Sequence, residues 1–145
     1  MIRKSQTLIP DLLIHNTLSM NPYSMIGAGI VIFALLSYSL SIITEQRTKL
    51  VTPFVLRFLT IGIILDITAT AFMIIGSTNS AFTLHGILGY SSLGGMLIDT
   101  ILIWRFHLAN KPGTVVTKSL HLYSRFAYAW WVIAFITGLM LVVFK

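Results

Sequence analysis

The groups in this sequence that could carry out chemistry are a few acids and histidines within long apolar runs. Residues 82–106, FTLHGILGYSSLGGMLIDTILIWRF, contain His85 and Asp99, and His107 follows directly. On a helix that turns about 100° per residue, His85 and Asp99 share one face with several small residues. An ionisable group facing lipid costs about 2.5–3.5 kcal/mol, so we expect this face to look toward protein or water. The face, called the polar stripe, consists of His85, Gly89, Ser92, Met96, Asp99 and Ile103.

A second acid, Asp66, lies near the middle of another apolar run, in LDITATAFM. At 1.5 Å per residue it lies about 15 Å from one end of its helix, and Asp99 lies about 9 Å from the opposite end of its own. His85 would lie at one surface, and His107 and His121 at the other. Read in this order, the groups could form a path for protons or cations.

Asp99 and His85 also have a purely structural interpretation. Asp99 could pair with Arg57 or Arg105, because acids buried in membranes usually find a cation. His85 could simply occupy a hydrated helix start. The spacing of the residues does not decide between a path and isolated structural groups.

Haem binding is another chemistry that these histidines allow. Membrane b-type cytochromes hold haem between two histidines on different helices at the same depth. His107 and His121 are expected at similar depth on neighbouring helices and are the candidate ligands, with His85 as a third. Fourteen residues after His85, where a stacked second haem would need its ligand, the sequence has Asp99. A single haem b between two of these histidines is thus an alternative cofactor. The sequence does not indicate any other metal.

The composition identifies the class of protein that holds these groups. The chain has 145 residues, of which 56% are hydrophobic and only 10% are charged, with no cysteine. A soluble domain usually carries about 25% charged residues, so this chain is predicted to be an integral membrane protein. Without cysteine it has no disulfide, thiolate metal site or iron–sulfur cluster. No nucleophile elbow, metalloprotease helix, phosphate loop or dinucleotide fingerprint is present, so an enzymatic activity is not expected.

Four apolar runs are long enough to span a bilayer as helices, over residues 23–44, 53–75, 82–106 and 121–144. Short connections between them predict an all-α, up-down four-helix bundle over residues 22–145. Asn21-Pro22 and Pro53 are helix-start signals. Residues 1–21 are mixed in character and would form a tail or an interfacial segment.

Small residues within the runs predict where helices pack closely. Gly27, Ala34 and Ser41 recur every seven residues, with Ser37 between the last two. The other packing positions are Gly62, Gly89 and Ser92. In the last run, one face would carry His121, Arg125, Tyr128, Val132, Phe135 and Leu139.

The distribution of Lys and Arg predicts the orientation. The net charge of +6 lies at helix ends rather than on a soluble face, which argues against nucleic-acid binding. By the positive-inside rule, the first and third loops face the cytoplasm and both termini face outward. These loops and the adjacent helix ends carry Arg47, Lys49, Arg57, Arg105, Lys111, Lys118 and Arg125.

Several of these segments together resemble the HsmA-like family of short bacterial four-helix membrane proteins. They are TEQRTKL, FLTIGIILDITATAFM, FTLHGILGYSSLGGMLIDTILIW and HLYSRFAYAWW. The family pattern has a Glu/Arg loop, an Asp-containing second helix, a His-Gly opening the third and a His with aromatics opening the fourth. The resemblance spans residues 22–144 and implies the fold, the topology and a place in a bacterial inner membrane, without an activity. The matching positions are Glu45, Asp66, His85, Gly86, Gly89 and His121.

We therefore expect a small polytopic membrane protein with a polar interior, acting as a subunit or accessory protein of a larger membrane assembly. Its partners would be the lipid bilayer and other membrane subunits or a second copy of itself. The alternatives are a b-type haem electron-transfer protein and a minimal proton or cation translocator.

Overall fold

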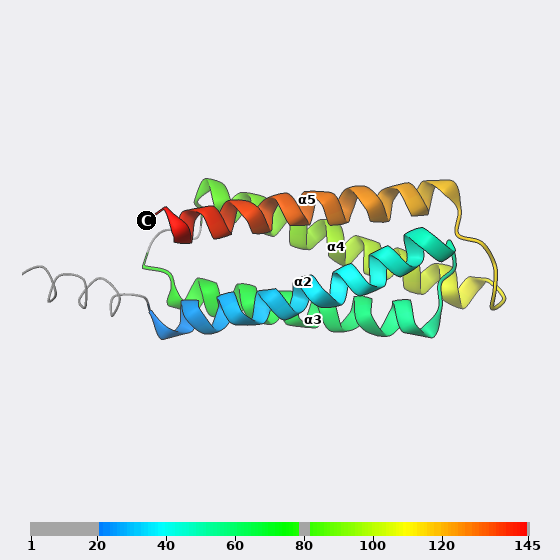
Figure 1. The fold of residues 1–145 in the computed structure, drawn as a ribbon, viewed down its shortest axis with the longest axis horizontal. Coiled ribbons are helices and arrows are strands. Elements are labelled where there is room, and N and C mark those ends of the chain that lie inside the picture. Colours follow the sequence, from blue (N-terminus) through cyan, green and yellow to red (C-terminus); the bar gives the residue numbers. More distant parts are fainter. Residues whose placement is uncertain (1–20, 79–81, 145) are drawn as a thin grey trace, which may run out of the picture.

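The computed structural model describes residues 21–78 and 82–144, and this part of the chain is all-α. Its helices are α2 (Pro22–Thr48), α3 (Pro53–Gly76), α4 (Leu84–Ala109) and α5 (Lys118–Val143). They run alternately in opposite directions, so each is antiparallel to the next (Figure 1). The expected all-α architecture with four helices is confirmed. Residues 1–20, and with them almost all of the expected tail or interfacial segment, lie outside the described residues.

Each helix begins at a residue whose side chain accepts a hydrogen bond from the first turn, which satisfies an otherwise free backbone N–H. Asn21 Oδ1 accepts from the backbone N of Tyr23 at 3.1 Å. Pro22 and Pro53 occupy the first turns of α2 and α3, as the sequence predicts. The remaining caps are threonines, at Thr52, Thr83 and Thr117.

The helix ends differ from the expected ones where polar residues are buried. The sequence places a loop from residue 45 onward, but α2 continues through Thr48. The extra turn forms because Glu45 is fully buried and bonded to His121 of α5, which itself lies inside the longer α5. The helix then ends at Lys49, whose left-handed backbone (φ 55°) turns the chain.

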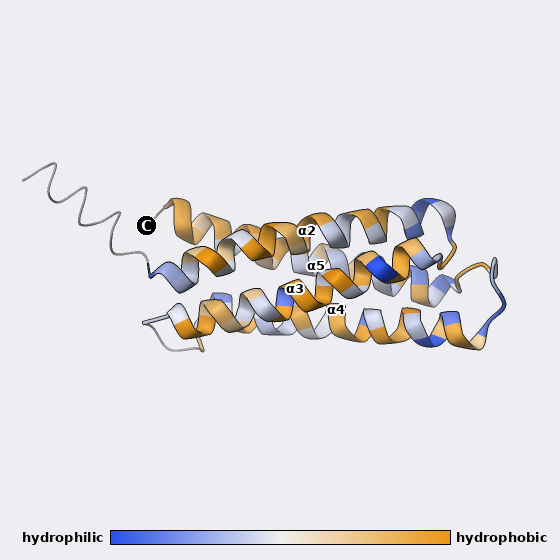
Figure 2. Cartoon of the chain, turned by 90° about the horizontal axis from the view of Figure 1, so that it is seen from below, coloured by the Kyte–Doolittle hydropathy of each residue, from blue (hydrophilic) through white to orange (hydrophobic). Residues whose placement is uncertain are grey.

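The loops 49–52 and 110–117 lie together at one end of the bundle. Leu50 and Val115 form an isolated antiparallel β-bridge there, and the backbone N of Val116 donates to the carbonyl of Lys49 at 2.8 Å. Figure 2 shows hydrophilic residues concentrated at this end and apolar residues along most of the helices. We call it the basic end, because it carries Arg47, Lys49, Lys111 and Lys118.

The bundle consists of two helical hairpins. The helices α2 and α3 pack closely over their length, and α4 packs mainly on α5, while α3–α4 and α2–α5 contacts join the two pairs (Figure 1). Glycines permit the closest approaches. A Cβ atom at Gly62 would lie 2.5 Å from a ring carbon of Tyr38, and one at Gly138 would lie 2.7 Å from the ring of His85.

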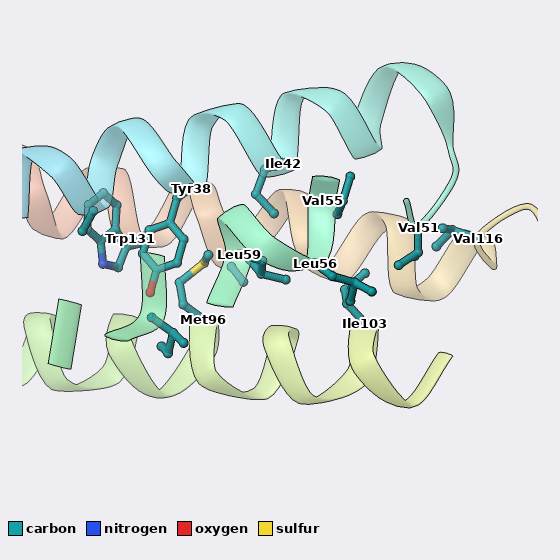
Figure 3. Close-up of a cluster of buried hydrophobic side chains, with 13 residues drawn as sticks. Tyr38, Ile42, Val51, Val55, Leu56, Leu59, Met96, Ile103, Val116 and Trp131 are labelled. Carbon is teal, nitrogen blue, oxygen red and sulfur yellow. The ribbon is translucent and has the colours of Figure 1, made fainter. Parts of the chain in front are cut away.

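The core between the hairpins is built from large side chains of all four helices. Tyr38, Leu59, Met96 and Ile103 are almost completely buried, and Trp131 of α5 lies edge-on to Tyr38 with 5.1 Å between ring centroids (Figure 3). The outward faces are rich in exposed Ile, Leu and Phe. By length and composition, all four helices are apolar enough to cross a membrane.

The inward face of α4 is the one expected. Four members of the polar stripe are buried, namely Ser92, Met96, Asp99 and Ile103. On α5, the face named from the sequence includes Arg125 and Leu139, which are exposed. The buried residues of α5 lie on a neighbouring face, which consists of Ser124, Ala127, Trp131 and Ala134.

Candidate functional site

Every acidic residue in the described part of the chain lies in the interior. Glu45 of α2 and Asp99 of α4 are fully buried, and Asp66 of α3 is 4% exposed. Each therefore needs polar partners within the protein, because a buried carboxyl group without them is costly. We call these three residues the carboxyl row.

Asp66 is held by two aromatic donors near the middle of the bundle. Its Oδ2 accepts from the indole Nε1 of Trp131 at 2.6 Å and from the hydroxyl of Tyr38 at 3.3 Å. Figure 3 shows these two side chains next to each other, with the indole nitrogen and the hydroxyl directed to the same side. Gly62 makes room for the Tyr38 ring, so the arrangement depends on a residue without a side chain.

Asp99 is held by a single donor. The hydroxyl of Ser124 donates to Oδ1 at 2.5 Å. The other carboxyl oxygen, Oδ2, is buried and has no hydrogen-bond partner within the described structure. Asp99 is thus the least satisfied member of the carboxyl row.

Glu45 lies in a polar cluster near the basic end. His121 Nδ1 lies 2.9 Å from Glu45 Oε1, and Gln46 Nε2 donates to Oε2 at 2.7 Å. Gln46 also donates to the carbonyl of His121 at 2.9 Å and accepts from Arg125 Nε at 3.1 Å. The cluster therefore joins α2 to the start of α5.

A single helix supplies a partner to every member of the carboxyl row. The partners on α5 are His121 for Glu45, Ser124 for Asp99 and Trp131 for Asp66. Their spacing of three and then seven residues keeps them on one face, over about 15 Å of helix length. The acids on three different helices thus converge on one face of α5.

The alternative of a buried Asp–Arg ion pair is wrong for the described residues. The sole ion pair among them is His121–Glu45. Arg57 and Arg105 are exposed, and Asp99 is bonded to Ser124 instead. The three acids of the carboxyl row are therefore bonded to neutral donors and to one histidine, and not to Lys or Arg.

His85 lies at the end of the bundle opposite the basic end. Its Nδ1 lies 3.1 Å from the hydroxyl of Thr137, and its ring packs on Gly138 of α5. It also lines a cavity of about 170 Å³ between α3 and α4, together with Thr70, Met73, Gly89 and Tyr90. Gly89 does not pack closely within the described chain, because a Cβ there would meet no atom within 4 Å.

The other expected packing residues lie at contacts between helices or within the core. Ser37 and Ser92 are buried, although the hydroxyl of Ser92 bonds to the carbonyl of Gly89 on its own helix. Gly62 packs directly on Tyr38.

The candidate haem ligands are engaged in other contacts. His121 is bonded through Nδ1 to Glu45, and His85 through Nδ1 to Thr137. The ring of His107 lies edge-on to Trp104, with 6.5 Å between centroids. Among the described residues, no three His, Asp or Glu side chains are grouped so as to hold a metal ion.

Comparison of the chain with protein-family models, curated proteins and solved structures finds no match.

The sequence marks part of the carboxyl row and misses the rest. Asp66 and Asp99 are conspicuous because each interrupts an apolar run. Glu45 is followed by Gln46 and Arg47, which makes it resemble the start of a loop. The contact between Glu45, in the last turns of α2, and His121, near the start of α5, is visible only once the helices are placed.

Proposed function

We propose that this chain is a small multi-pass membrane protein that moves protons through the carboxyl row. The observation that carries the proposal is the burial of Glu45, Asp66 and Asp99 without a Lys or Arg partner among the described residues. Ionisable groups inside membrane bundles are costly and commonly serve proton relays or ion pathways. The short connections and apolar outer faces support placing these groups inside the bilayer.

The ends of the row support transfer between the two surfaces. The Glu45–His121 pair lies at the basic end, and His85 lies at the opposite end beside a cavity. Asp66 and Asp99 occupy the interior between them. By the positive-inside rule, the basic end would face the cytoplasm of a bacterial cell and the C-terminus would face outward.

Proton flux into liposomes tests this function. The purified chain is reconstituted with a trapped pH-sensitive dye, and a potassium gradient with valinomycin supplies the driving force. We expect Asp66→Asn and Asp99→Asn each to reduce the protein-dependent flux by about tenfold or more, because a positioned proton-transfer group contributes about 10²–10⁴-fold. Asparagine is nearly the same size as aspartate but does not exchange a proton in this way.

The matched control is Asp11→Asn, the same change at the acidic residue outside the carboxyl row and outside the described residues. We expect this variant to retain wild-type flux. Helical circular dichroism and a single gel-filtration peak in detergent show that each variant is folded. Equal flux in wild type and both row variants would contradict the proposal.

A second candidate is an accessory subunit of a larger membrane assembly. The cavity beside Gly89 favours it, because this small residue on α4 leaves space that no described side chain fills within 4 Å of its missing Cβ. A side chain of a neighbouring membrane helix would fit such a space. Folded wild-type chain that moves no protons alone would leave this candidate as the stronger one. The resemblance to HsmA-like proteins is compatible with either function.

A further inference from the structure

The carboxyl group of Asp99 is satisfied on one side only. Oδ1 accepts from Ser124, whereas Oδ2 has no partner within the described structure, and the residue is 0% exposed. A buried polar atom left unpaired costs about 1–3 kcal/mol, and more when the group is charged. A serine or alanine at position 99 would avoid this cost. The presence of an unpaired carboxyl oxygen there therefore indicates that Oδ2 of Asp99 is a binding atom.

The groups around Asp99 limit what it could bind. Glu45 and Tyr38 of α2 are buried in the same interior, and on α5 the hydroxyl of Tyr123 donates to the carbonyl of Gly95, one turn before Asp99. From α3, Asp66 is linked to the same region through its bond to Tyr38. None of these groups is a Lys or Arg side chain. The missing partner of Oδ2 is therefore most simply a proton, which needs no further oxygen ligands.

A route for that proton begins at the basic end. His121 is 17% exposed, whereas its partner Glu45 is fully buried. Solvent therefore reaches the pair from the histidine side. Gln46 holds the second oxygen of Glu45 and is itself bonded to Arg125, so the carboxyl group has a fixed position.

We propose that Oδ2 of Asp99 is the proton-binding atom of the bundle and that the Glu45–His121 pair delivers the proton from water at the basic end. This inference rests on the proposed function and names its site of uptake. Hydronium in the water at the basic end gives a proton to Nε2 of His121 and becomes water, while Nδ1–H passes its proton to Oε1 of Glu45. Glu45 then gives this proton through intervening water to the Asp99 carboxylate, so that Glu45 is again a carboxylate and Asp99 is neutral. His121 is left with its proton on Nε2, and proton exchange with water returns it to the Nδ1–H form before the next transfer.

Infrared spectroscopy of the full chain in lipid nanodiscs tests the binding atom directly. A stepwise change of pH should produce the carbonyl band of a protonated carboxyl group, and this band should shift in heavy water. We expect the band to be lost in Asp99→Asn. In Ser124→Ala the band should remain but change frequency, because the hydrogen bond to Oδ1 is removed. A wild-type band that persists unchanged in Asp99→Asn would overturn the assignment, and so would the absence of any such band from wild type.

The delivery route is tested by the rate at which the Asp99 band responds to a pH jump. We expect His121→Asn to slow the response by about tenfold or more, since a positioned proton-transfer group is removed. Glu45→Gln should slow it similarly while keeping an oxygen for His121. The matched control is His107→Asn, which should leave the rate unchanged. Unchanged rates in both His121→Asn and Glu45→Gln would overturn the route.

These spectra do not depend on flux, so the two proposals fail separately. A pH-responsive Asp99 band in a chain that moves no protons into liposomes would contradict the proposed function and leave the site standing. Proton flux with no Asp99 band would overturn the site and leave the function standing.

Discussion

The bond between Trp131 and Asp66 is the clearest case of one residue fixing another across the bundle. The indole Nε1 donates at 2.6 Å to an acid 65 positions earlier in the chain. The adjacent Trp130 instead donates to Ser91 at the exposed surface. Two neighbouring tryptophans therefore have different roles, because successive helical positions point about 100° apart.

This difference predicts unequal effects of the same substitution. Trp131→Phe removes a buried donor and leaves Tyr38 as the remaining described partner of Asp66, so it should destabilise the fold by about 1–3 kcal/mol. Trp130→Phe should change stability by less than about 1 kcal/mol, because solvent or headgroups replace its exposed bond. Reversible unfolding in mixed detergent, followed by circular dichroism, measures both. Equal losses of stability would contradict the assigned role of Trp131.

At this scale the sequence predicts which residues are unusual but not what they contact. Asp66 and Asp99 are evident because acids rarely lie within apolar runs. Ser124 has no such mark, because serine is an ordinary packing residue of membrane helices. Trp131 lies near the middle of its run rather than at an interface, but the adjacent Trp130 does too, so the sequence does not show which of them meets an acid. The partner of each acid depends on the rotation of α5. Polar residues at the start of α5 lie on both its buried and its exposed sides, as Ser124 and Arg125 do, so their positions in the sequence do not fix that rotation.

At the scale of helices, the α2–α3 hairpin depends on close contact at Gly62. Gly62→Ala would bring a Cβ to 2.5 Å from the ring of Tyr38, which is far inside normal contact distance. We expect a loss of about 1–3 kcal/mol, typical of overpacking, together with a weaker bond between Tyr38 and Asp66. Reversible unfolding in mixed detergent, followed by circular dichroism, measures this loss of stability.

Gly29→Ala on α2 is the matched control for this prediction. A Cβ at Gly29 would meet no described atom within 4 Å, and the residue is exposed. Alanine there should leave stability unchanged or raise it by up to about 1 kcal/mol through its higher helix propensity. Greater destabilisation by Gly29→Ala than by Gly62→Ala would show that the hairpin packs through a different face.

The helices themselves were predictable, and their ends less so. The small-residue pattern of α2 identifies its buried face correctly, since Gly27, Ala34, Ser37 and Ser41 are all buried. The sequence predicts that α2 ends before Glu45, because a glutamate followed by glutamine and arginine is typical of a solvent-exposed loop; in the structure, the helix continues to Thr48. The burial of Glu45 depends on His121, which lies 76 positions away and is brought near only by the packing of α5.

At the scale of the whole molecule, the separation of charge predicts the orientation in the membrane. The chain has no cysteine, so a single introduced cysteine reports its side unambiguously. Thr78, after α3, and Thr114, in the loop at the basic end, are both exposed. In intact cells, a membrane-impermeant maleimide should label Thr78→Cys and leave Thr114→Cys unlabelled until the cells are opened. The reverse pattern would contradict the proposed orientation.

Proton movement along the carboxyl row requires these three acids to face α5 inside the bundle and not the surrounding lipid. Asp99 and Ser124 are in contact, whereas the neighbouring Ile98 is 50% exposed. The most direct measurement is cross-linking in native membranes with dibromobimane, which fluoresces when it joins two nearby cysteines. The double variant Asp99→Cys/Ser124→Cys should become fluorescent, and Ile98→Cys/Ser124→Cys should not. Fluorescence from the second pair without the first would contradict the inward position of Asp99.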